Sequence, residues 1–213
     1  MKIEPVKIPI SDSIGSVSGE FVIPEKMDAL LVLAHGAGAD MHHKFMKSLA
    51  KGLAETGIGT LRYNFPFMEN KKGRPDVPAV AEKTIESAIA LAHEAFPKVS
   101  LFAGGKSFGG RMTSNLLSKR QIDVKGIVFY GFPLHAPGKP STDRAAHLKD
   151  VKVPMLFLQG TRDTLASLEL IEKVTSSLPR ATLEIFEGAD HSFAAGKKDV
   201  MSDLVARSRA WIK

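Results

Sequence analysis

At 213 residues, of which 44% are hydrophobic and 24% charged, the chain has the composition of an ordinary globular protein and can bury one sizeable core. We therefore expect one domain over residues 1–213. The chain contains no cysteine, which excludes disulfide bonds, thiolate catalysis and cysteine-based metal sites. Its formal net charge is +6, but the basic residues are scattered among acidic ones and form no aromatic-interleaved stripe or DNA-binding motif. We expect a solvated basic surface and no nucleic-acid partner.

No stretch of the sequence indicates a membrane-directed or membrane-spanning segment. The opening stretch, MKIEPVKIPISDS, lacks the uninterrupted apolar core of a secretory signal. The longest apolar run, at 29–34, falls far short of the roughly 20 residues that span a bilayer. We expect a cytoplasmic protein without a membrane partner.

The chain opens with two short alternating segments, at 2–9 and 17–23, and the turn residues between them predict an antiparallel hairpin. Short apolar runs then alternate with helical patterns. The apolar runs lie at 29–34, 59–65, 99–103, 126–131, 154–159 and 182–186. The helical patterns lie at 43–55, 77–96, 108–119, 167–178 and 199–212. This alternation predicts an α/β fold with a mostly parallel sheet of eight strands and helices on both faces. Ligands of such sheets bind beyond the carboxyl ends of the strands.

The stretch LFAGGKSFGG at 101–110 fits two motifs that exclude each other. GGKS resembles the end of a phosphate-binding loop, whereas GKSFG fits the G-x-S-x-G turn that presents a nucleophilic Ser107. The phosphate-loop pattern needs its first glycine at position 100, where Ser100 stands. Leu101 and Phe102 also continue an apolar strand where the phosphate loop would need free backbone N–H groups. We therefore favour the nucleophile turn.

A nucleophile turn needs a strand, a sharp turn with a strained serine, and a helix. The run at 99–103 supplies the strand and the pattern at 108–119 supplies the helix. Gly105 and Gly109 stand two residues before and after Ser107, where side chains would collide as strand and helix close on each other. The sequence thus predicts that Ser107 is presented as a nucleophile.

A serine hydroxyl needs a base to take its proton and an acid to orient that base. Asp163 follows the run at 154–159, and His191 follows the run at 182–186, in the chain order Ser, Asp, His. Two alternatives remain: Asp163 could cap the next helix, and His191 could be an ordinary loop histidine. Asp190 is a rival acid, but adjacent side chains point apart. We expect Ser107, Asp163 and His191 to form a catalytic triad.

An oxyanion hole would use the N–H after the nucleophile, that of Phe108, and a second N–H from the loop after 29–34, which places it at Ala37. Gly36 and Gly38 would let this backbone approach the substrate closely. We expect His35 to support the loop, with a catalytic role as the weaker alternative.

The neighbouring histidines at 42 and 43 raise the question of a metal site. Adjacent side chains on a helix point apart, and no third ligand follows at a suitable spacing. We expect no metal and no cofactor.

Taken together, these residues resemble the α/β-hydrolase superfamily, and within it the small dienelactone-hydrolase-like proteins. More narrowly, the chain resembles the branch that includes the hydrolase-like domain of a subunit of the NSL histone-acetyltransferase complex. The resemblance is carried by HGAGADM (35–41), GKSFGGR (105–111), GFPLHAPGKP (131–140) and QGTRD (159–163).

The resemblance implies an α/β-hydrolase fold over essentially the whole chain. It also implies the triad Ser107, Asp163 and His191, with Ala37 and Phe108 as oxyanion donors. Dienelactone hydrolases proper use a cysteine nucleophile, which this chain lacks. The lactone substrate is therefore not inherited with the family.

The connection at 131–153, where cap domains of this fold are inserted, has room for at most one short helix, so we expect no cap and an open site. The loop at 65–78 is expected to form a wall of that site, although its Phe65 and Phe67 could equally pack onto the core. The residues expected to contact substrate are His35, Gly36, Gly38, Phe65, Phe67 and Pro133.

The expected function is hydrolysis of small carboxylic esters through an acyl-enzyme, with a small-molecule ester as the partner. Two alternatives stay open. The chain could be a non-catalytic binding or scaffold protein that uses the loop at 131–144, or a thioesterase, amidase or acyltransferase with the same triad. The sequence does not indicate an oligomeric state.

Overall fold

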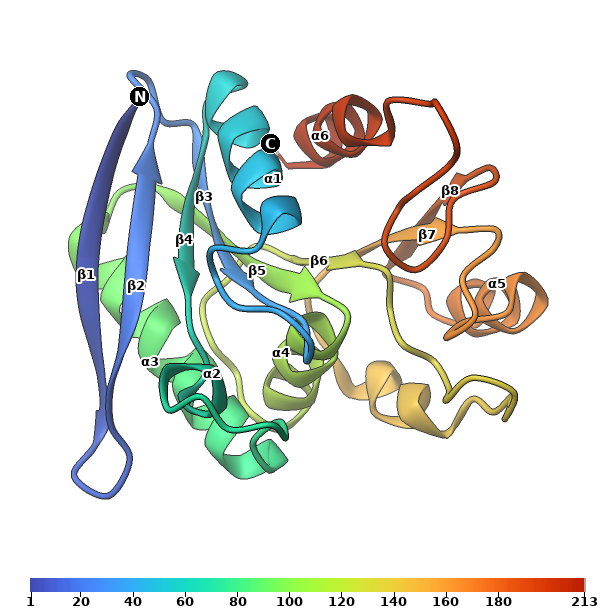
Figure 1. Cartoon of the computed structure of the whole chain (residues 1–213), viewed down its shortest axis with the longest axis horizontal. Helices are drawn as coiled ribbons and strands as arrows, with labels where there is room; N and C mark the ends of the chain where they lie inside the picture. Colours follow the sequence, from blue (N-terminus) through green and yellow to red (C-terminus); the bar gives the residue numbers. More distant parts are fainter. Residues whose placement is uncertain (213) are drawn as a thin grey trace.

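The computed structural model describes residues 1–212; Lys213, the last residue of the predicted 1–213 domain, lies outside them. Within residues 1–212 the strands form one sheet of eight, in the order β1-β2-β4-β3-β5-β6-β7-β8 (Figure 1). Strands β3 to β8 pair in parallel, whereas β1 and β2 are antiparallel. The strands are β1 (Lys2–Ser11), β2 (Gly15–Ile23), β3 (Ala29–Ala34), β4 (Ile58–Tyr63), β5 (Ser100–Lys106), β6 (Ile127–Tyr130), β7 (Met155–Gly160) and β8 (Ala181–Phe186). The predicted mostly parallel sheet of eight strands is confirmed.

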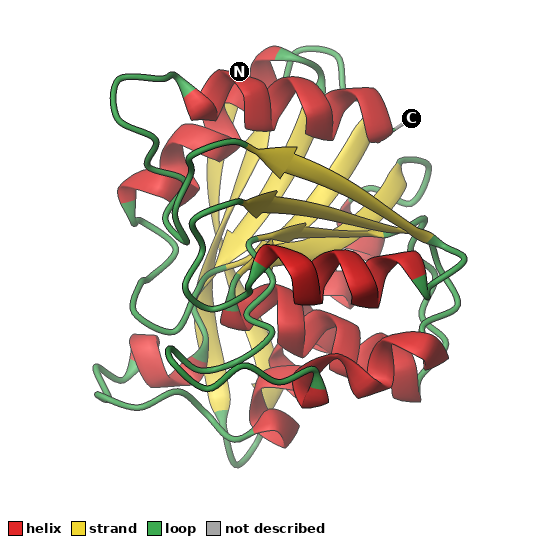
Figure 2. Cartoon of the chain, turned by 90° about the vertical axis from the view of Figure 1, so that its right-hand side faces the viewer, coloured by secondary structure: helices red, strands yellow, loops and turns green. Residues whose placement is uncertain are grey.

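Helices cover both faces of this sheet, as predicted (Figure 2). One layer holds α1 and α6, which pack against each other; the other holds α3, α4 and the 3₁₀ helix η1. The helices are α1 (Lys44–Glu55), α2 (Pro66–Glu69), α3 (Pro78–Ala95), α4 (Phe108–Lys119), η1 (Asp143–Asp150), α5 (Leu168–Ser176) and α6 (Val200–Trp211). No helix within residues 1–212 combines the length and the apolar character needed to cross a membrane.

The central strands are buried on both faces, which explains why their sequences are continuously apolar. In β3, Leu30 and Val32 point into the core beneath α3 and α4, whereas Leu31 and Leu33 point into the core beneath α1 and α6. Each of these leucines is fully buried, which stabilises the fold by about 1.5–3 kcal/mol per side chain. Because successive side chains of a strand point to opposite faces of the sheet, β3 contributes to the hydrophobic cores on both faces.

The hairpin of β1 and β2 forms one edge of the sheet, as expected from the alternating segments at the start of the chain. Gly15 closes the turn with a φ of 85°, a left-handed conformation that favours glycine. Strand β1 has β2 as its pairing partner on one side, and it carries Pro5 and Pro9 along its length. The hairpin is thus the antiparallel flank of an otherwise parallel sheet.

Strand β5 is longer than the apolar run at 99–103 predicts. It continues through Gly104 and Gly105 to Lys106, because these glycines still pair with Leu33 and Ala34 of β3. Glycine carries no apolar side chain, so the hydropathy pattern ends before the backbone pairing does. This extension places residue 107 directly at the end of a strand.

The connection from β6 to β7 contains η1 and no other helix, so the expected absence of a cap domain is confirmed. The short helix α2 was not expected from the sequence. It begins with Pro66 at its first position and spans four residues, too few for a helical period to show.

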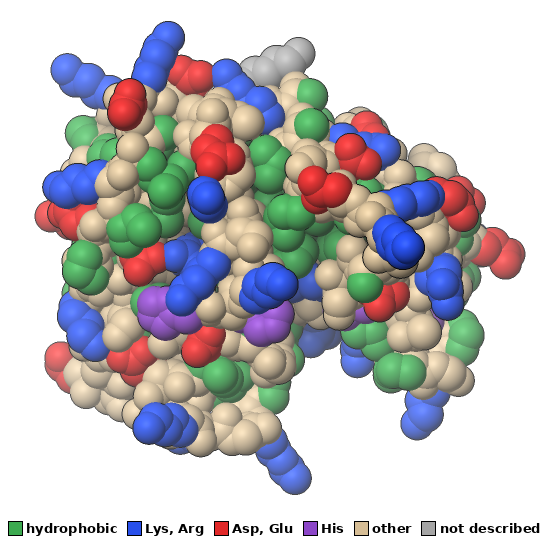
Figure 3. All heavy atoms as spheres, turned by 45° about the horizontal axis from the view of Figure 1, so that its top comes forward, with side chains coloured by type: hydrophobic (Ala, Val, Ile, Leu, Met, Phe, Trp, Pro, Cys, Tyr) green, Lys and Arg blue, Asp and Glu red, His purple; other side chains and the backbone are tan. Residues whose placement is uncertain are grey.

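Acidic and basic side chains are mixed on the surface seen in Figure 3. Lys and Arg side chains lie beside Asp and Glu side chains over this face and form no continuous basic stripe there. The surface pairs include Lys119 with Glu82 and Arg207 with Glu184. Such exposed pairs contribute little stability, about 0–1 kcal/mol each.

Candidate functional site

Ser107 lies at the junction of β5 and α4, in a backbone conformation that is costly for a residue with a side chain. Its φ is 50° and its ψ is −115°, which lies in the left-handed half of conformational space. Such strain costs on the order of 1–3 kcal/mol and persists only where the surroundings impose it. Here the N–H of Ser107 donates to the carbonyl of Tyr130, and its carbonyl accepts from the N–H of Arg111. The strained turn that the motif predicts is present.

The two flanking glycines are required by close backbone approaches. A Cβ at Gly105 would lie 2.3 Å from the carbonyl oxygen of Ala34, and a Cβ at Gly109 would lie 2.6 Å from that of His35. Both glycines therefore let α4 start directly against the end of β3, so the crowding comes from this neighbouring strand and not, as predicted, from the closing of β5 and α4 on each other. The unbroken strand β5 also removes the loop that a phosphate cradle would need.

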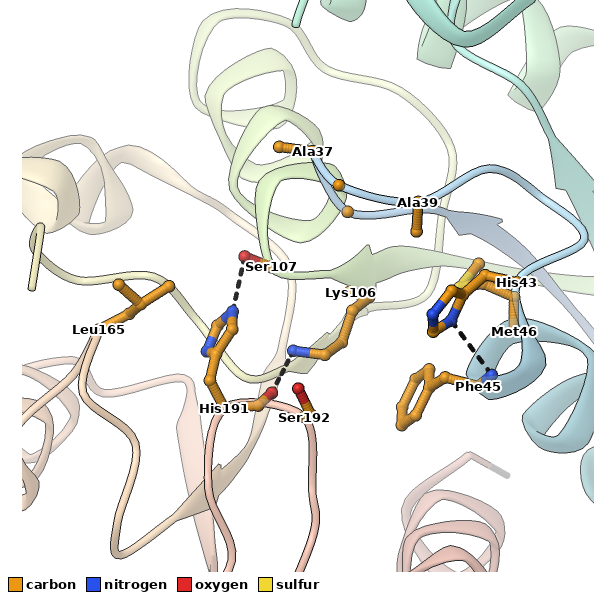
Figure 4. A pocket seen from close by; sticks show the side chains of 12 residues that line it. Ala37, Ala39, His43, Phe45, Met46, Lys106, Ser107, Leu165, His191 and Ser192 are labelled. Atoms are coloured by element: carbon orange, nitrogen blue, oxygen red, sulfur yellow. Dashed lines mark hydrogen bonds between the residues drawn. The ribbon is translucent and has the colours of Figure 1, made fainter. Parts of the chain in front are cut away.

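The structure brings Ser107, His191 and Asp163 together from three different loops (Figure 4 shows the first two). Ser107 follows β5, Asp163 follows β7 and His191 follows β8. His191 Nδ1 donates to Asp163 Oδ2 at 2.7 Å, and Ser107 Oγ donates to His191 Nε2 at 2.9 Å. An ionised carboxylate can only accept, so it fixes the imidazole tautomer that leaves Nε2 free to take the serine proton. The hydroxyl, imidazole and carboxylate thus form one hydrogen-bonded chain.

Asp163 is held in place by further hydrogen bonds. Its Oδ2 accepts from Gln159 Nε2 at 2.5 Å, and its Oδ1 accepts from the N–H of Leu165 at 2.8 Å. The carboxylate therefore contacts the turn after β7 and does not cap α5. Gln159 is fully buried, and its Oε1 accepts from the N–H of Phe132. Sequence reasoning missed Gln159, although an amide that ends an apolar strand was a usable signal.

The rival acid Asp190 has a different role. Its Oδ1 accepts from the N–H groups of Ser192 and Ala194, so the side chain ties its own loop together. This loop carries His191 at its centre. Asp190 therefore shapes the loop, whereas Asp163 contacts the imidazole.

Two backbone N–H groups lie beside Ser107 without a hydrogen-bond partner in residues 1–212, those of Ala37 and Phe108. Phe108 begins α4, so its N–H belongs to the first turn, which has no intrahelical acceptor. The loop after β3 approaches Ser107 closely, because a Cβ at Gly36 would lie 3.7 Å from the Cβ of Ser107. Both predicted oxyanion donors are thus placed next to the serine.

His35 supports this loop from inside the protein. The side chain is fully buried; Nδ1 donates to the carbonyl of Gly36 at 2.7 Å, and Nε2 accepts from the N–H of Phe65 at 3.0 Å. Burial lowers the pKa of His35 from its ordinary value of 6.5 to about 4. A neutral, doubly hydrogen-bonded imidazole therefore joins the loop at 35–38 to the start of the loop at 65–78.

A cavity of about 350 Å³ opens beside Ser107, at the small end of ligand pockets, which span roughly 300–1,000 Å³. One side is formed by the loop after β3 and another by the start of α1, with His191 and Lys106 facing them (Figure 4). Its lining residues are Gly36, Ala37, Gly38, Ala39, His43, Phe45, Met46, Lys106, Ser107, Leu165, His191 and Ser192. Among the described residues that line the cavity, none carries a carboxylate.

Only some of the residues expected to contact substrate line this cavity. Gly36 and Gly38 belong to it, whereas His35, Phe65, Phe67 and Pro133 do not. Phe65 and Phe67 stack on each other and meet the ring of Phe108, so they pack in the core and form no wall of the cavity. Pro133 is also buried. The apolar wall is supplied instead by two residues of α1 and one of the loop after β7, none of which was expected to contact substrate: Phe45, Met46 and Leu165.

Lys106 is a second residue that sequence reasoning missed. It fills the variable position before the serine in G-x-S-x-G, which carries no information in the motif itself. Its Nζ donates to the carbonyl of His191 at 2.5 Å. Burial lowers the pKa of Lys106 from 10.5 to about 8, although the charges of Asp163 and Asp190 oppose the shift.

The neighbouring histidines at 42 and 43 do not gather further ligands. His43 caps α1, where its Nδ1 accepts from the N–H of Phe45 at 3.3 Å. Within residues 1–212, no three His, Asp or Glu side chains are grouped as metal ligands would be.

Because His35 is buried in its neutral form, we expect acid to destabilise the fold around the oxyanion loop at 35–38. A pKa of about 4 in the folded chain against 6.5 in the unfolded chain means that the unfolded state binds more protons between these values. The stability that the fold gains from keeping His35 neutral is therefore fully present above pH 6.5 and is lost as the pH falls towards 4. A shift from 6.5 to about 4 corresponds to a loss on the order of 3 kcal/mol.

Urea unfolding at pH 7 and pH 4.5 measures this loss. His35→Gln keeps a donor and an acceptor but does not titrate, so we expect the variant to lose less stability on acidification than the parent. His147, whose pKa is also lowered to about 4, mainly by burial, shifts stability with the same sign. His147→Gln is thus the matched variant, and equal acid loss in His35→Gln and the parent would exclude His35 as the sensor.

Comparisons with known proteins identify the family and the fold of the chain. The family model described as an alpha/beta hydrolase domain matches residues 27–210. A curated relative from Mycobacterium tuberculosis, provisionally named a phosphoribosyl transferase, is 27% identical over 183 residues, which are 83% of this chain and 39% of that protein. The chain thus spans about two fifths of the length of the curated relatives it matches.

Solved structures show the same fold. A dienelactone hydrolase from Anabaena variabilis superposes with a TM-score of 0.81 at 19% identity, covering 99% of this chain and 96% of that chain. A protein from Xanthomonas campestris, described as an α/β serine hydrolase without a lid, superposes with a TM-score of 0.75 at 20% identity, covering 98% and 95%. At these identities the likeness establishes the architecture alone.

Proposed function

We propose, from the premise that this chain belongs to the alpha/beta hydrolase domain family, that it hydrolyses carboxylic esters of small molecules with Ser107 as the nucleophile. The observation that carries the proposal is the hydrogen-bonded chain from Ser107 through His191 to Asp163. Family membership supplies the fold, and a fold hosts many functions, so the activity has to rest on the site.

The proposed reaction has two halves. In the first, Ser107 Oγ attacks the ester carbonyl while His191 Nε2 takes the serine proton, and the same imidazolium then protonates the leaving alcohol. In the second, His191 takes a proton from water, the hydroxide adds to the acyl-enzyme, and the proton returns to Ser107 as the acid leaves. Asp163 keeps the imidazole oriented and stabilises its cation in both halves.

The negative charge that develops on the carbonyl oxygen needs donors aimed at it. The unpartnered N–H groups of Ala37 and Phe108 support this role, and each such donor contributes about 10²–10³-fold in kcat in related catalysis. The cavity beside them is small and lined on one side by Phe45 and Met46, which suits a short acyl group. The residues themselves carry out every step, and no cofactor is needed.

The name of the Mycobacterium tuberculosis relative suggests another reaction, phosphoribosyl transfer. Three fifths of that protein lie outside the match, and we propose that the part shared with this chain is its hydrolase-like portion. The narrower resemblance to the branch with the NSL-complex subunit stays a prediction. The same holds for the alternatives of thioester or amide cleavage and acyl transfer, which use the same chemistry.

Labelling with a fluorophosphonate probe tests the proposal without a known substrate, because the probe reacts with a serine that a base has activated. We expect one adduct on the native protein by intact mass and none on Ser107→Ala. Ser192→Ala is the matched control, since Ser192 also lines the cavity but within residues 1–212 its hydroxyl makes no hydrogen bond to the imidazole, whose partners are Ser107 and Asp163. This control should label like the parent.

Absence of an adduct on folded native protein would overturn the proposal and favour the binding or scaffold alternative. If the adduct forms, matched oxygen esters, thioesters and amides of one short acyl group then rank the reaction classes by kcat/KM. We expect the oxygen ester to be turned over best.

A further inference from the structure

Lys106 lies beside the nucleophile and the base without belonging to the triad. Its side chain runs along the cavity from the end of β5 towards the loop after β8, as Figure 4 shows. There its Nζ donates to the main-chain carbonyl of His191 at 2.5 Å. No other donor within residues 1–212 reaches that carbonyl.

The space around this ammonium is shaped to admit it. The rings of Phe45 and Phe193 lie 5.9 and 5.5 Å from Nζ, within the range of cation–π attraction. Gly131 adopts a φ of 73°, and a Cβ there would lie 3.1 Å from Lys106 Nζ and 3.5 Å from the imidazole of His191. The backbone at 131 thus leaves room for the ammonium and the imidazole together.

The ammonium has no carboxylate partner in residues 1–212, where every salt bridge involves other groups. A cation that is largely removed from water and has no carboxylate in contact destabilises the folded state, and the nearby charges of Asp163 and Asp190 offset only part of this cost. An apolar side chain of similar length would avoid this cost. Groups kept at the expense of stability are concentrated at functional sites, which points to a role of Lys106 in the chemistry next to it.

We propose that Lys106 is a positioning residue: its ammonium holds the carbonyl of His191 and so keeps the imidazole aligned between Ser107 and Asp163. The inference rests on the proposed function. Asp190 fixes the flanks of the loop through Ser192 and Ala194, but the carbonyl of His191 itself is held by Lys106. Without that bond, the loop can rotate the imidazole away from the serine.

Lys106→Met removes the donor and the charge while keeping the length of the stem. We expect kcat for a neutral aryl acetate to fall about 10²-fold, the effect of a misplacement of about 1 Å, with KM unchanged. The rate of fluorophosphonate labelling should fall by a similar factor. Lys44→Met, at the exposed first position of α1, is the matched control and should leave both rates unchanged.

The melting temperature distinguishes this role from simple structural support. Because the folded-state pKa of Lys106 is about 8 and its ordinary value is 10.5, the unfolded chain binds more protons between these values. The burial cost is fully present below pH 8 and is relieved as the pH rises towards 10.5. We therefore expect Lys106→Met to melt no lower than the parent at pH 7, with any gain shrinking by pH 10.

Three results would overturn the proposal. Lys106→Met could label and turn over ester as fast as the parent, or it could melt well below the parent, which would make the lysine a structural support. It could also lose activity only on an ester whose acyl group carries a carboxylate, such as an aryl hemisuccinate, which would make the ammonium a receptor for substrate charge. Absence of labelling in the parent would instead overturn the proposed function, so the two failures are distinguishable.

Discussion

Asp163→Asn is expected to lower kcat for ester hydrolysis by about 10⁴-fold while the fold stays intact. The Oδ2 atom of Asp163 accepts from both His191 Nδ1 and Gln159 Nε2. An amide that turns its NH₂ group towards the imidazole stabilises the tautomer with the proton on Nε2, which can no longer accept from Ser107. Turnover of an aryl acetate, with the melting temperature as the check on folding, measures the effect.

Asp190→Asn is the control that the chain offers for this variant. The side chain of Asp190 accepts two backbone N–H bonds through Oδ1, and an asparagine oxygen can accept both. We expect a change in kcat of no more than about tenfold. Equal losses in the two variants would contradict the assignment of Asp163 as the residue that orients the base.

Gly109→Ala is expected to cost about 1–3 kcal/mol of stability and most of the probe reactivity. A Cβ at this position would lie 2.6 Å from the carbonyl oxygen of His35 and 2.7 Å from the Cβ of Ala34. The obstacle is backbone and a short side chain, so α4 must move away from β3. That movement displaces Phe108 N–H and the turn at Ser107 together. Urea unfolding and the rate of probe labelling measure the two effects.

Gly38→Ala is the matched control, because nothing lies within 4 Å of a Cβ at Gly38 and its φ does not require glycine. It lies in the loop that carries Ala37, so it tests whether any added methyl near the serine is harmful. We expect unchanged stability. A Gly109→Ala variant as stable and reactive as Gly38→Ala would show that the helix can shift without consequence, contrary to the expectation.

The sequence alone predicted most of the fold because its signals are local. The run ALLVLA is β3 to the residue, and the helical pattern at 108–119 is α4. The positions of Ser107, Asp163 and His191 after β5, β7 and β8 also followed, since parallel strands deliver their carboxyl ends to one edge of the sheet.

The cavity wall was harder to predict because apolar side chains near a site look alike in sequence. Phe65 and Phe67 turn inwards to meet His35, whereas Phe45 and Met46 lie at the start of α1, where part of an apolar helix face reaches past the sheet into the cavity. Hydropathy does not distinguish an apolar residue that fills the core from one that lines an opening. The difference depends on where α1 begins relative to the end of β5.

Lys106 could not be found by motif or by charge. Its position in G-x-S-x-G is variable, and a single lysine among 29 basic residues carries no pattern. Only the approach of the loop after β8 brings the carbonyl of His191 to its ammonium across 85 residues of sequence. Long-range contacts of this kind depend on the tertiary fold.

The edge strand β1 also limits how the sheet can grow. In a strand at an edge, alternate N–H groups point away from the sheet and can recruit a strand of another molecule. Pro5 and Pro9 lie on the same set of alternate positions, with Lys7 between them, and proline has no N–H to offer. A strand laid along β1 would therefore meet gaps in the row of donors on either side of a charged residue. The exposed edge is a poor template for aggregation, whatever reaction the other end of the sheet performs.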